Sequence, residues 1–125
     1  MSPPVTEKIF TIRLGDRMPY LAYRFPFPLT DALSVDFSAR EAGAAPPFID
    51  RQPAQIANGT YVIDGVSTVL SPNDANAVVF YPWAVGDTAA ARDSCQFLFH
   101  ITWAGPKQET VPSEGYGRFK ISDNF

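Results

Sequence analysis

The sequence of 125 residues contains one cysteine, Cys95, and one histidine, His100. A single cysteine excludes an intrachain disulfide and a zinc site built from cysteines. Any catalytic dyad or triad with an imidazole would have to use His100, five residues after Cys95. Because an odd separation along one strand places side chains on opposite faces, these two are not expected to pair. We therefore expect no catalytic residues and no enzymatic activity.

Charged residues are also scarce, at 18% of the chain, and the net charge is −3. No basic block is present, which argues against nucleic acid and against an anionic membrane surface as partners. The longest apolar run, Ala77–Val85, contains Pro82 and is far shorter than the roughly 20 residues of a membrane span. The start, Met1–Pro4, lacks the charged and apolar regions of a signal peptide. These features predict a protein that is made in a reducing cytoplasm.

The acidic residues form no recognisable motif. Asp31 and Asp36 are separated by an odd number of positions, and Asp87 and Asp93 flank a turn. Such residues are typical of caps and solvated turns. Asp74 is the one charge in the segment SPNDANA, which is too little for a calcium loop. We expect no metal site and no cofactor, and the glycines do not form a phosphate-binding loop.

Aromatic residues, by contrast, are abundant, with ten Phe, five Tyr and two Trp, and twelve Pro and eight Gly interrupt the chain. Apolar and polar residues alternate in short segments bounded by turn residues, a period that predicts strands. These segments are 8–16, 20–25, 32–40, 54–64, 66–70, 77–83, 95–105 and 108–121. The pattern predicts an all-β fold, an antiparallel immunoglobulin-like β-sandwich of about eight strands.

The clearest strand is 32–40. Its apolar residues recur at every second position, and its polar residues occupy the positions between them. The inward face is predicted to carry Leu33, Val35, Phe37 and Ala39. Segment 95–105 alternates in the same way, with Phe97, Phe99, Ile101 and Trp103 on one face.

Turn residues predict how the strands connect. Asn58-Gly59 suits the positive φ angles of a type I′ turn and predicts a hairpin. Pro82 should end the strand before it, and Pro112 and Gly115 should interrupt the last segment. Ser71, or Asp87 or Thr88, could cap one short helical turn at most.

A dense aromatic stretch contains Tyr20, Tyr23, Phe25 and Phe27. Alternation predicts that most of these side chains belong to the core. The other interpretation is an exposed patch that binds a sugar or a protein, because aromatic residues are enriched at binding hot spots.

The second half of the chain also carries an ordered set of residues. A strand ending Tyr-x-Trp runs into Gly-Asp-Thr, an aromatic strand follows, and a Thr-x-Pro element leads to Gly-Tyr and a last strand. The matching residues are Tyr81, Trp83, Gly86, Asp87, Thr88, Gly105, Thr110, Pro112, Gly115, Tyr116 and Ile121. In this order they resemble the amino-terminal domain of phage baseplate upper proteins and its immunoglobulin-like relatives in tailed-phage virions. The first half, including IRLGDRMPYLAYRF and LTDALSVDFSAR, matches more loosely.

The resemblance implies an immunoglobulin-like sandwich with a structural role and no catalysis. The chain would then be an adaptor or connecting subunit of a phage tail, baseplate or neck, located in the virion. Its partners would be other virion proteins, and it would form a homo-oligomeric ring. Residues 1–125 would be one domain, with arms at about 1–8 and 122–125. The alternative is a decoration protein or carbohydrate-binding module on the capsid or tail, which would use exposed aromatics such as Tyr20 or Tyr23.

Overall fold

A computed structural model describes residues 10–18, 20–43, 46–63, 65–105, 107–113 and 115–123. Within these residues the protein is all-β and contains no helix, as the alternating segments predict. The strands are β1 (Phe10–Arg13), β2 (Leu21–Arg24), β3 (Ala32–Glu41), β4 (Ile49–Pro53), β5 (Gln55–Ile56), β6 (Gly59–Ile63), β7 (Val66–Leu70), β8 (Val78–Tyr81), β9 (Arg92–Trp103), β10 (Lys107–Val111) and β11 (Gly117–Ser122).

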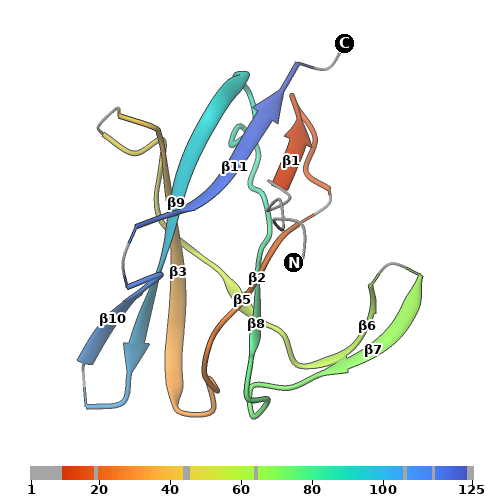
Figure 1. Ribbon diagram of the computed structural model, residues 1–125, viewed down its shortest axis with the longest axis vertical. Coiled ribbons are helices and arrows are strands. Elements are labelled where there is room, and N and C mark those ends of the chain that lie inside the picture. The colour runs from red at the N-terminus through yellow and green to blue at the C-terminus, as the bar shows by residue number, and fades with distance from the viewer. Residues whose placement is uncertain are drawn as a thin grey trace, which may run out of the picture.

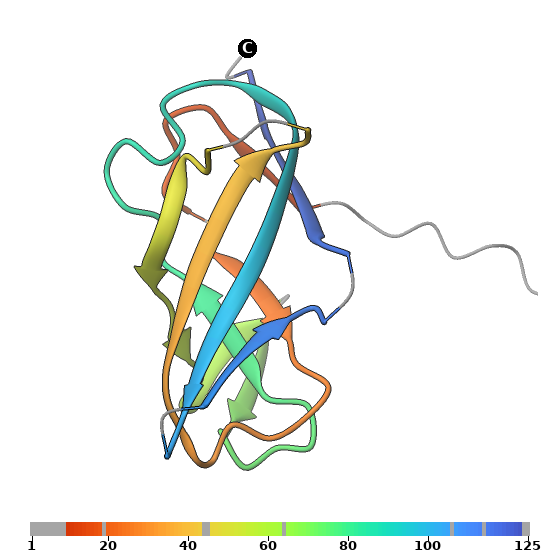
Figure 2. The same ribbon diagram turned by 90° about the vertical axis from the view of Figure 1, so that its left-hand side faces the viewer.

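Two sheets form a β-sandwich, and a separate hairpin stands beside it (Figure 1). The larger sheet has the order β1-β11-β9-β3-β4, and β10 also pairs with β9. The smaller sheet has the order β2-β8-β5. Neighbouring strands are antiparallel except β1 and β11, which are parallel. The long strands β3 and β9 run side by side through the centre of the larger sheet (Figure 2).

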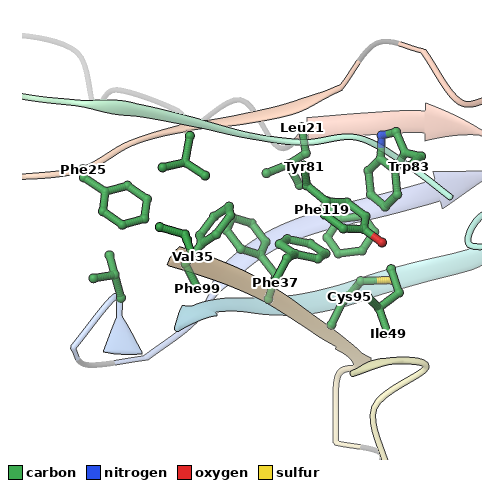
Figure 3. Packing of buried hydrophobic residues seen from close by; sticks show 14 of the residues in the cluster. Leu21, Phe25, Val35, Phe37, Ile49, Tyr81, Trp83, Cys95, Phe99 and Phe119 are labelled. Carbon is green, nitrogen blue, oxygen red and sulfur yellow. The ribbon is translucent and has the colours of Figure 1, made fainter. Parts of the chain in front are cut away.

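The core lies between the two sheets, and aromatic side chains dominate it (Figure 3). Phe37 of β3 stacks on Tyr81 of β8, with ring centroids 4.2 Å apart. Phe99 and Phe119 from the larger sheet also contact Phe37. Aromatic pairs of this kind add about 0.5–1.5 kcal/mol each beyond their buried area. The predicted inward positions of β9 are confirmed, with Trp103 only partly buried at the end of the strand.

Leu33 is the exception to the predicted inward face of β3. Val35, Phe37 and Ala39 are buried, but Leu33 is 68% exposed. The pairing of β3 with β9 shifts register between Ala32 and Ser34. Leu33 is the extra residue at this shift and has no partner on β9, so it leaves the alternation of the strand and points to solvent. The prediction for this residue was wrong because alternation alone does not reveal a bulge.

The hairpin predicted at Asn58-Gly59 is also wrong in its position. Gly59 is the first residue of β6, and the strand before it, β5, pairs with β8 instead. The hairpin joins β6 to β7, in register from Gly59↔Leu70 to Ile63↔Val66. Its connection contains Gly65 at φ 78°, a left-handed conformation that glycine adopts without strain.

The remaining turns contain no helical turn among the described residues, and side-chain hydrogen bonds support the backbone bonds that close them. The Ser71 hydroxyl accepts the Asn73 N–H at 3.1 Å, and the Asp74 carboxylate accepts the Ser71 N–H at 2.9 Å. The predicted amino-terminal arm, 1–8, lies outside the described residues. At the other end, Ser122 pairs with Arg13 as the last residue of β11.

Candidate protein-binding face

The first group of signature residues, from Tyr81 to Thr88, lies at the end of β8 and in the turn that follows it. Tyr81 and Trp83 are both buried in the core, and their rings contact each other edge to face at 5.2 Å. The carboxylate of Asp87 accepts the Tyr81 hydroxyl at 2.5 Å and the Ala84 N–H at 2.8 Å. Burial and this hydrogen bond raise the pKa of Tyr81, so the phenol stays protonated. Asp87 therefore caps the turn after β8 and satisfies a buried hydroxyl at the same time.

Thr88 connects this turn to the one that follows β1. Its hydroxyl donates to the carbonyl of Asp16 at 2.8 Å, and its own carbonyl accepts the Gly15 N–H at 2.9 Å. Gly86 lies in the turn after β8, just before Asp87, and has φ 92°. Thr88 is the one polar residue that is buried in the described part of the chain. These contacts give Gly86, Asp87 and Thr88 structural roles.

The other signature residues lie where the last segment of the chain crosses β9. β10 and β11 pair with successive parts of β9, and Pro112 and Gly115 lie between them, as predicted. Tyr116 is partly exposed, and the guanidinium of Arg40 lies over its ring at 4.9 Å. The structure thus places Pro112, Gly115 and Tyr116 at an interruption of one edge of the sheet.

Gly117 is a structural residue that the sequence reasoning missed. A Cβ atom there would lie 2.1 Å from the ring of Phe97, which is its partner across the β11–β9 ladder. A side chain cannot be accommodated without displacing a buried aromatic ring. The signal in the sequence was the second glycine of Gly115-Tyr116-Gly117, because a turn at Gly115 does not require a glycine at position 117 as well.

A second group of polar residues surrounds His100 on the outer face of the larger sheet. The His100 Nε2 lies 3.1 Å from the Ser38 hydroxyl, which also accepts the Arg51 N–H at 3.0 Å. Burial, and then the positive charge of Arg51, lowers the pKa of His100, while Asp36 and Asp50 oppose that shift. Arg51 has φ 47° beside the register shift between β3 and β4.

Ser38 therefore satisfies the N–H of a strained residue at a bulge, and His100 packs against that hydroxyl. A hollow of about 290 Å³ lies beside them. Among the residues that the structure describes, no carboxylate forms a hydrogen bond with His100. Ser38 and His100 therefore form a pair that lacks the carboxylate of a catalytic triad.

Cys95 lies on the opposite face of β9 from His100, as its odd separation predicts. The thiol is fully buried, and burial raises the pKa of Cys95 to about 11. A thiol in that state is protonated and unreactive at neutral pH. Over the described ranges, no group of three or more His, Cys, Asp or Glu side chains lies close enough to hold a metal ion.

The aromatic stretch between β1 and the loop after β2 is mainly part of the core. Phe25 is buried, and Tyr23 and Phe27 pack against the core cluster. Tyr20 differs, since it is 40% exposed. It lines a groove on the outer face of the smaller sheet.

This groove has a volume of about 660 Å³ and is mostly apolar. β2 and β8 form its floor, and β6 forms one wall. We call it the β6 groove, and its lining residues are Met18, Tyr20, Ala22, Tyr23, Arg24, Gln55, Tyr61, Val62, Val78 and Phe80. Tyr61 packs this wall against β8, because the centroid of its ring lies 5.1 Å from that of Phe80.

The β6–β7 hairpin is the most exposed apolar element of the described chain. It projects to the side of the two sheets (Figure 1). Val62, Val66 and Val69 are 76%, 63% and 75% exposed. Val62 and Val69 share one face of the hairpin, since Val62 pairs with Ser67 and Thr60 pairs with Val69. Val66 lies on the other face, because it pairs with Ile63. Exposed valines on both faces of a projecting ribbon indicate an interaction surface.

Sequence reasoning missed this hairpin as a site. The signal was the Asp64-Gly65 pair between two segments of alternating residues, which is as strong a hairpin signal as Asn-Gly. The valines of those segments looked like core residues, and alternation cannot tell a core face from a face that awaits a partner.

Comparison of the sequence with models of known protein families and with curated proteins finds no match in either set. No helix in the described part of the chain is both long and apolar enough to cross a membrane.

Proposed function

We propose that the protein is a structural subunit of a tailed-phage virion, an adaptor or connecting subunit that acts through protein–protein contacts. The ordered residues from Tyr81 to Tyr116 support the immunoglobulin-like family on which this proposal rests. They also occupy structural positions, as expected of a fold signature: Tyr81 and Trp83 fill the core, and Asp87 and Thr88 form the turn behind them.

The observation that carries the proposal is the exposed β6–β7 hairpin. An isolated two-stranded ribbon is only marginally stable in water. Three exposed valines add an unfavourable apolar surface to it. Both costs are removed when a neighbouring protein covers the ribbon, as it would be in an assembled particle. Within a ring of identical subunits, the hairpin would contact the next subunit or an adjoining ring.

The test is the composition of the purified particle. We expect mass spectrometry of gradient-purified virions to find this chain in several copies per particle. A variant with Val62→Lys, Val66→Lys and Val69→Lys should fold but be absent from particles. Because Leu33 and Val85 are equally exposed but lie elsewhere, Leu33→Lys with Val85→Lys is the matched control and should be incorporated normally. Absence of the wild-type chain from particles would contradict the proposal.

A second function is favoured by one specific observation, the aromatic lining of the β6 groove. Tyr20, Tyr61 and Phe80 could stack on sugar rings, as a carbohydrate-binding decoration module requires. A glycan array probed with the isolated protein separates the two functions. Binding that is lost in Tyr20→Ala would favour the carbohydrate module, and no binding would favour the adaptor.

A further inference from the structure

The free edge of β6 is an open site for another strand. Among the described residues, β6 pairs with β7 and with no other strand, so its second edge carries backbone N–H and C=O groups without a strand partner. Natural proteins protect such edges with charged residues, proline or a covering element. The sequences of β6 and β7, GTYVI and VSTVL, contain neither a charge nor a proline.

This edge lies along the β6 groove. Tyr61 and Val62 line the groove, whereas no residue of β7 does, so the groove is on the β6 side of the hairpin. Phe80 and Val78 supply an apolar floor from β8. A strand added to β6 would therefore have backbone partners on one side and an apolar surface beneath alternate side chains.

The groove also has a charge preference. Arg24 is the one charged residue in its lining, and it is exposed. Over the part of the chain that the structure describes, the backbone of Arg24 pairs with β8, whereas its guanidinium makes no hydrogen bond and no ion pair. A carboxylate on the incoming segment would complement it, and a lysine would be repelled.

We propose that the β6 groove binds an extended segment of another protein, added as a strand to the free edge of β6. The segment alternates apolar residues, which pack on Phe80 and Tyr61, with polar ones, and it carries one acidic residue that meets Arg24. The five residues of β6 correspond to a contact of roughly 17 Å at 3.3 Å per residue. The strands of a second copy's hairpin do not fit this chemistry, because β6 and β7 carry no acidic residue that could lie beside Arg24, and the one acidic residue of the hairpin sequence, Asp64, falls between the two strands.

This inference rests on the proposed function, since it names the kind of segment through which the subunit binds its neighbour. The probes are three fluorescein-labelled ten-residue peptides in which valine alternates with threonine between Gly-Ser ends. The first has glutamate in place of one central threonine, and the second has lysine there. The third keeps the glutamate but has proline in place of a central valine, which removes an N–H donor and prevents strand pairing.

Fluorescence anisotropy should show that the glutamate peptide binds about fivefold more tightly than the lysine peptide, as a partly exposed charge pair predicts. The proline peptide should not bind. The variant Arg24→Glu should reverse the preference between the first two peptides. Its control is Arg118→Glu, at an arginine that is also exposed but lies on β11 in the other sheet, and this variant should leave the preference unchanged.

The edge itself is tested with Val62→Lys and Val69→Lys. The two valines are 76% and 75% exposed on the same face of the hairpin, but only Val62 lines the groove. We expect Val62→Lys to abolish binding of the glutamate peptide and Val69→Lys to retain it. Equal effects of the two variants, equal affinity for the glutamate and lysine peptides, or binding of the proline peptide would overturn the proposal.

Sedimentation of the free protein tests whether a second copy of the chain occupies the groove instead. A dimer that Val62→Lys dissociates, together with no peptide binding, would assign the groove to a second copy and would also overturn the proposal. The presence of the chain in purified virions is measured separately. A subunit found in particles without peptide binding would refute strand addition alone, whereas peptide binding by a chain absent from particles would refute the virion role alone.

Discussion

Replacing Phe37 by alanine should remove the centre of the core. The ring is fully buried and contacts five other aromatic rings, which are those of Tyr81, Trp83, Phe97, Phe99 and Phe119. Truncation of a buried Phe costs about 3–5 kcal/mol. The partners come from both sheets, so they cannot all move to fill the cavity, and we expect the upper part of this range.

The assay is equilibrium unfolding in urea, followed by the fluorescence of the two tryptophans, Trp83 and Trp103. The ring centroid of Trp83 lies 6.2 Å from that of Phe37. For m near 2 kcal/mol/M, a loss of 4 kcal/mol lowers the midpoint by about 2 M. The matched control is Leu33→Ala on the same strand. Because Leu33 points to solvent, its truncation should change stability by about 0.5 kcal/mol or less.

If β3 alternated without the bulge, Phe37 and Leu33 would both be buried. Comparing the two variants therefore shows whether the bulge is present. Similar large losses for Phe37→Ala and Leu33→Ala would show that Leu33 is inward. A midpoint for Phe37→Ala within about 0.3 M of the wild type would refute the central place of Phe37 in the core.

Three further changes test the turns and the polar face. Asp87→Ala leaves the buried Tyr81 hydroxyl without its acceptor and should cost about 1–3 kcal/mol in urea unfolding. A much smaller loss in a Tyr81→Phe background would identify the unpaired hydroxyl as the cause, and an equal loss would exclude that cause. Gly117→Ala drives a methyl group into the Phe97 ring and should cost about 1–3 kcal/mol, as overpacking does, so an unchanged midpoint would contradict the close approach. The pKa of His100 is lower in the folded state than its unfolded value near 6.5, so the unfolded chain binds the proton first and stability is lost as pH falls below that value. His100→Gln should lose less stability than the wild type between pH 7 and pH 5, and identical pH profiles would refute this assignment.

The sequence was sufficient for the fold class because each long strand alternates strongly enough to define its buried face. Phe37 and Phe99 were predictable as core residues on that basis alone. Leu33 was not, because a bulge depends on how β3 pairs with β9, and pairing is a property of two segments far apart in the sequence. The hairpin was misplaced for a related reason: Asn58-Gly59 and Asp64-Gly65 are competing turn signals, and only the pairing of β5 with β8 decides between them.

The candidate site could be predicted less well than the fold. Val62 and Val69 have the sequence signature of core residues, and only the projection of the hairpin leaves them exposed. The groove combines residues from β2, β5, β6 and β8, which no local pattern brings together. By contrast, the cap made by Asp87 was predictable, because capping requires only a carboxylate a few residues from an exposed N–H.

The parallel pairing of β1 with β11 has a mechanical consequence. Phe10 lies opposite Phe119 and Arg13 opposite Ser122, so the chain enters this pair at one end and leaves it at the other. A force that pulls these two strands outward along the chain loads all their hydrogen bonds together, in shear. An antiparallel pair pulled from one end would instead open one bond at a time. The β1–β11 pair is therefore arranged to resist tension that is applied through the start of β1 and the end of β11.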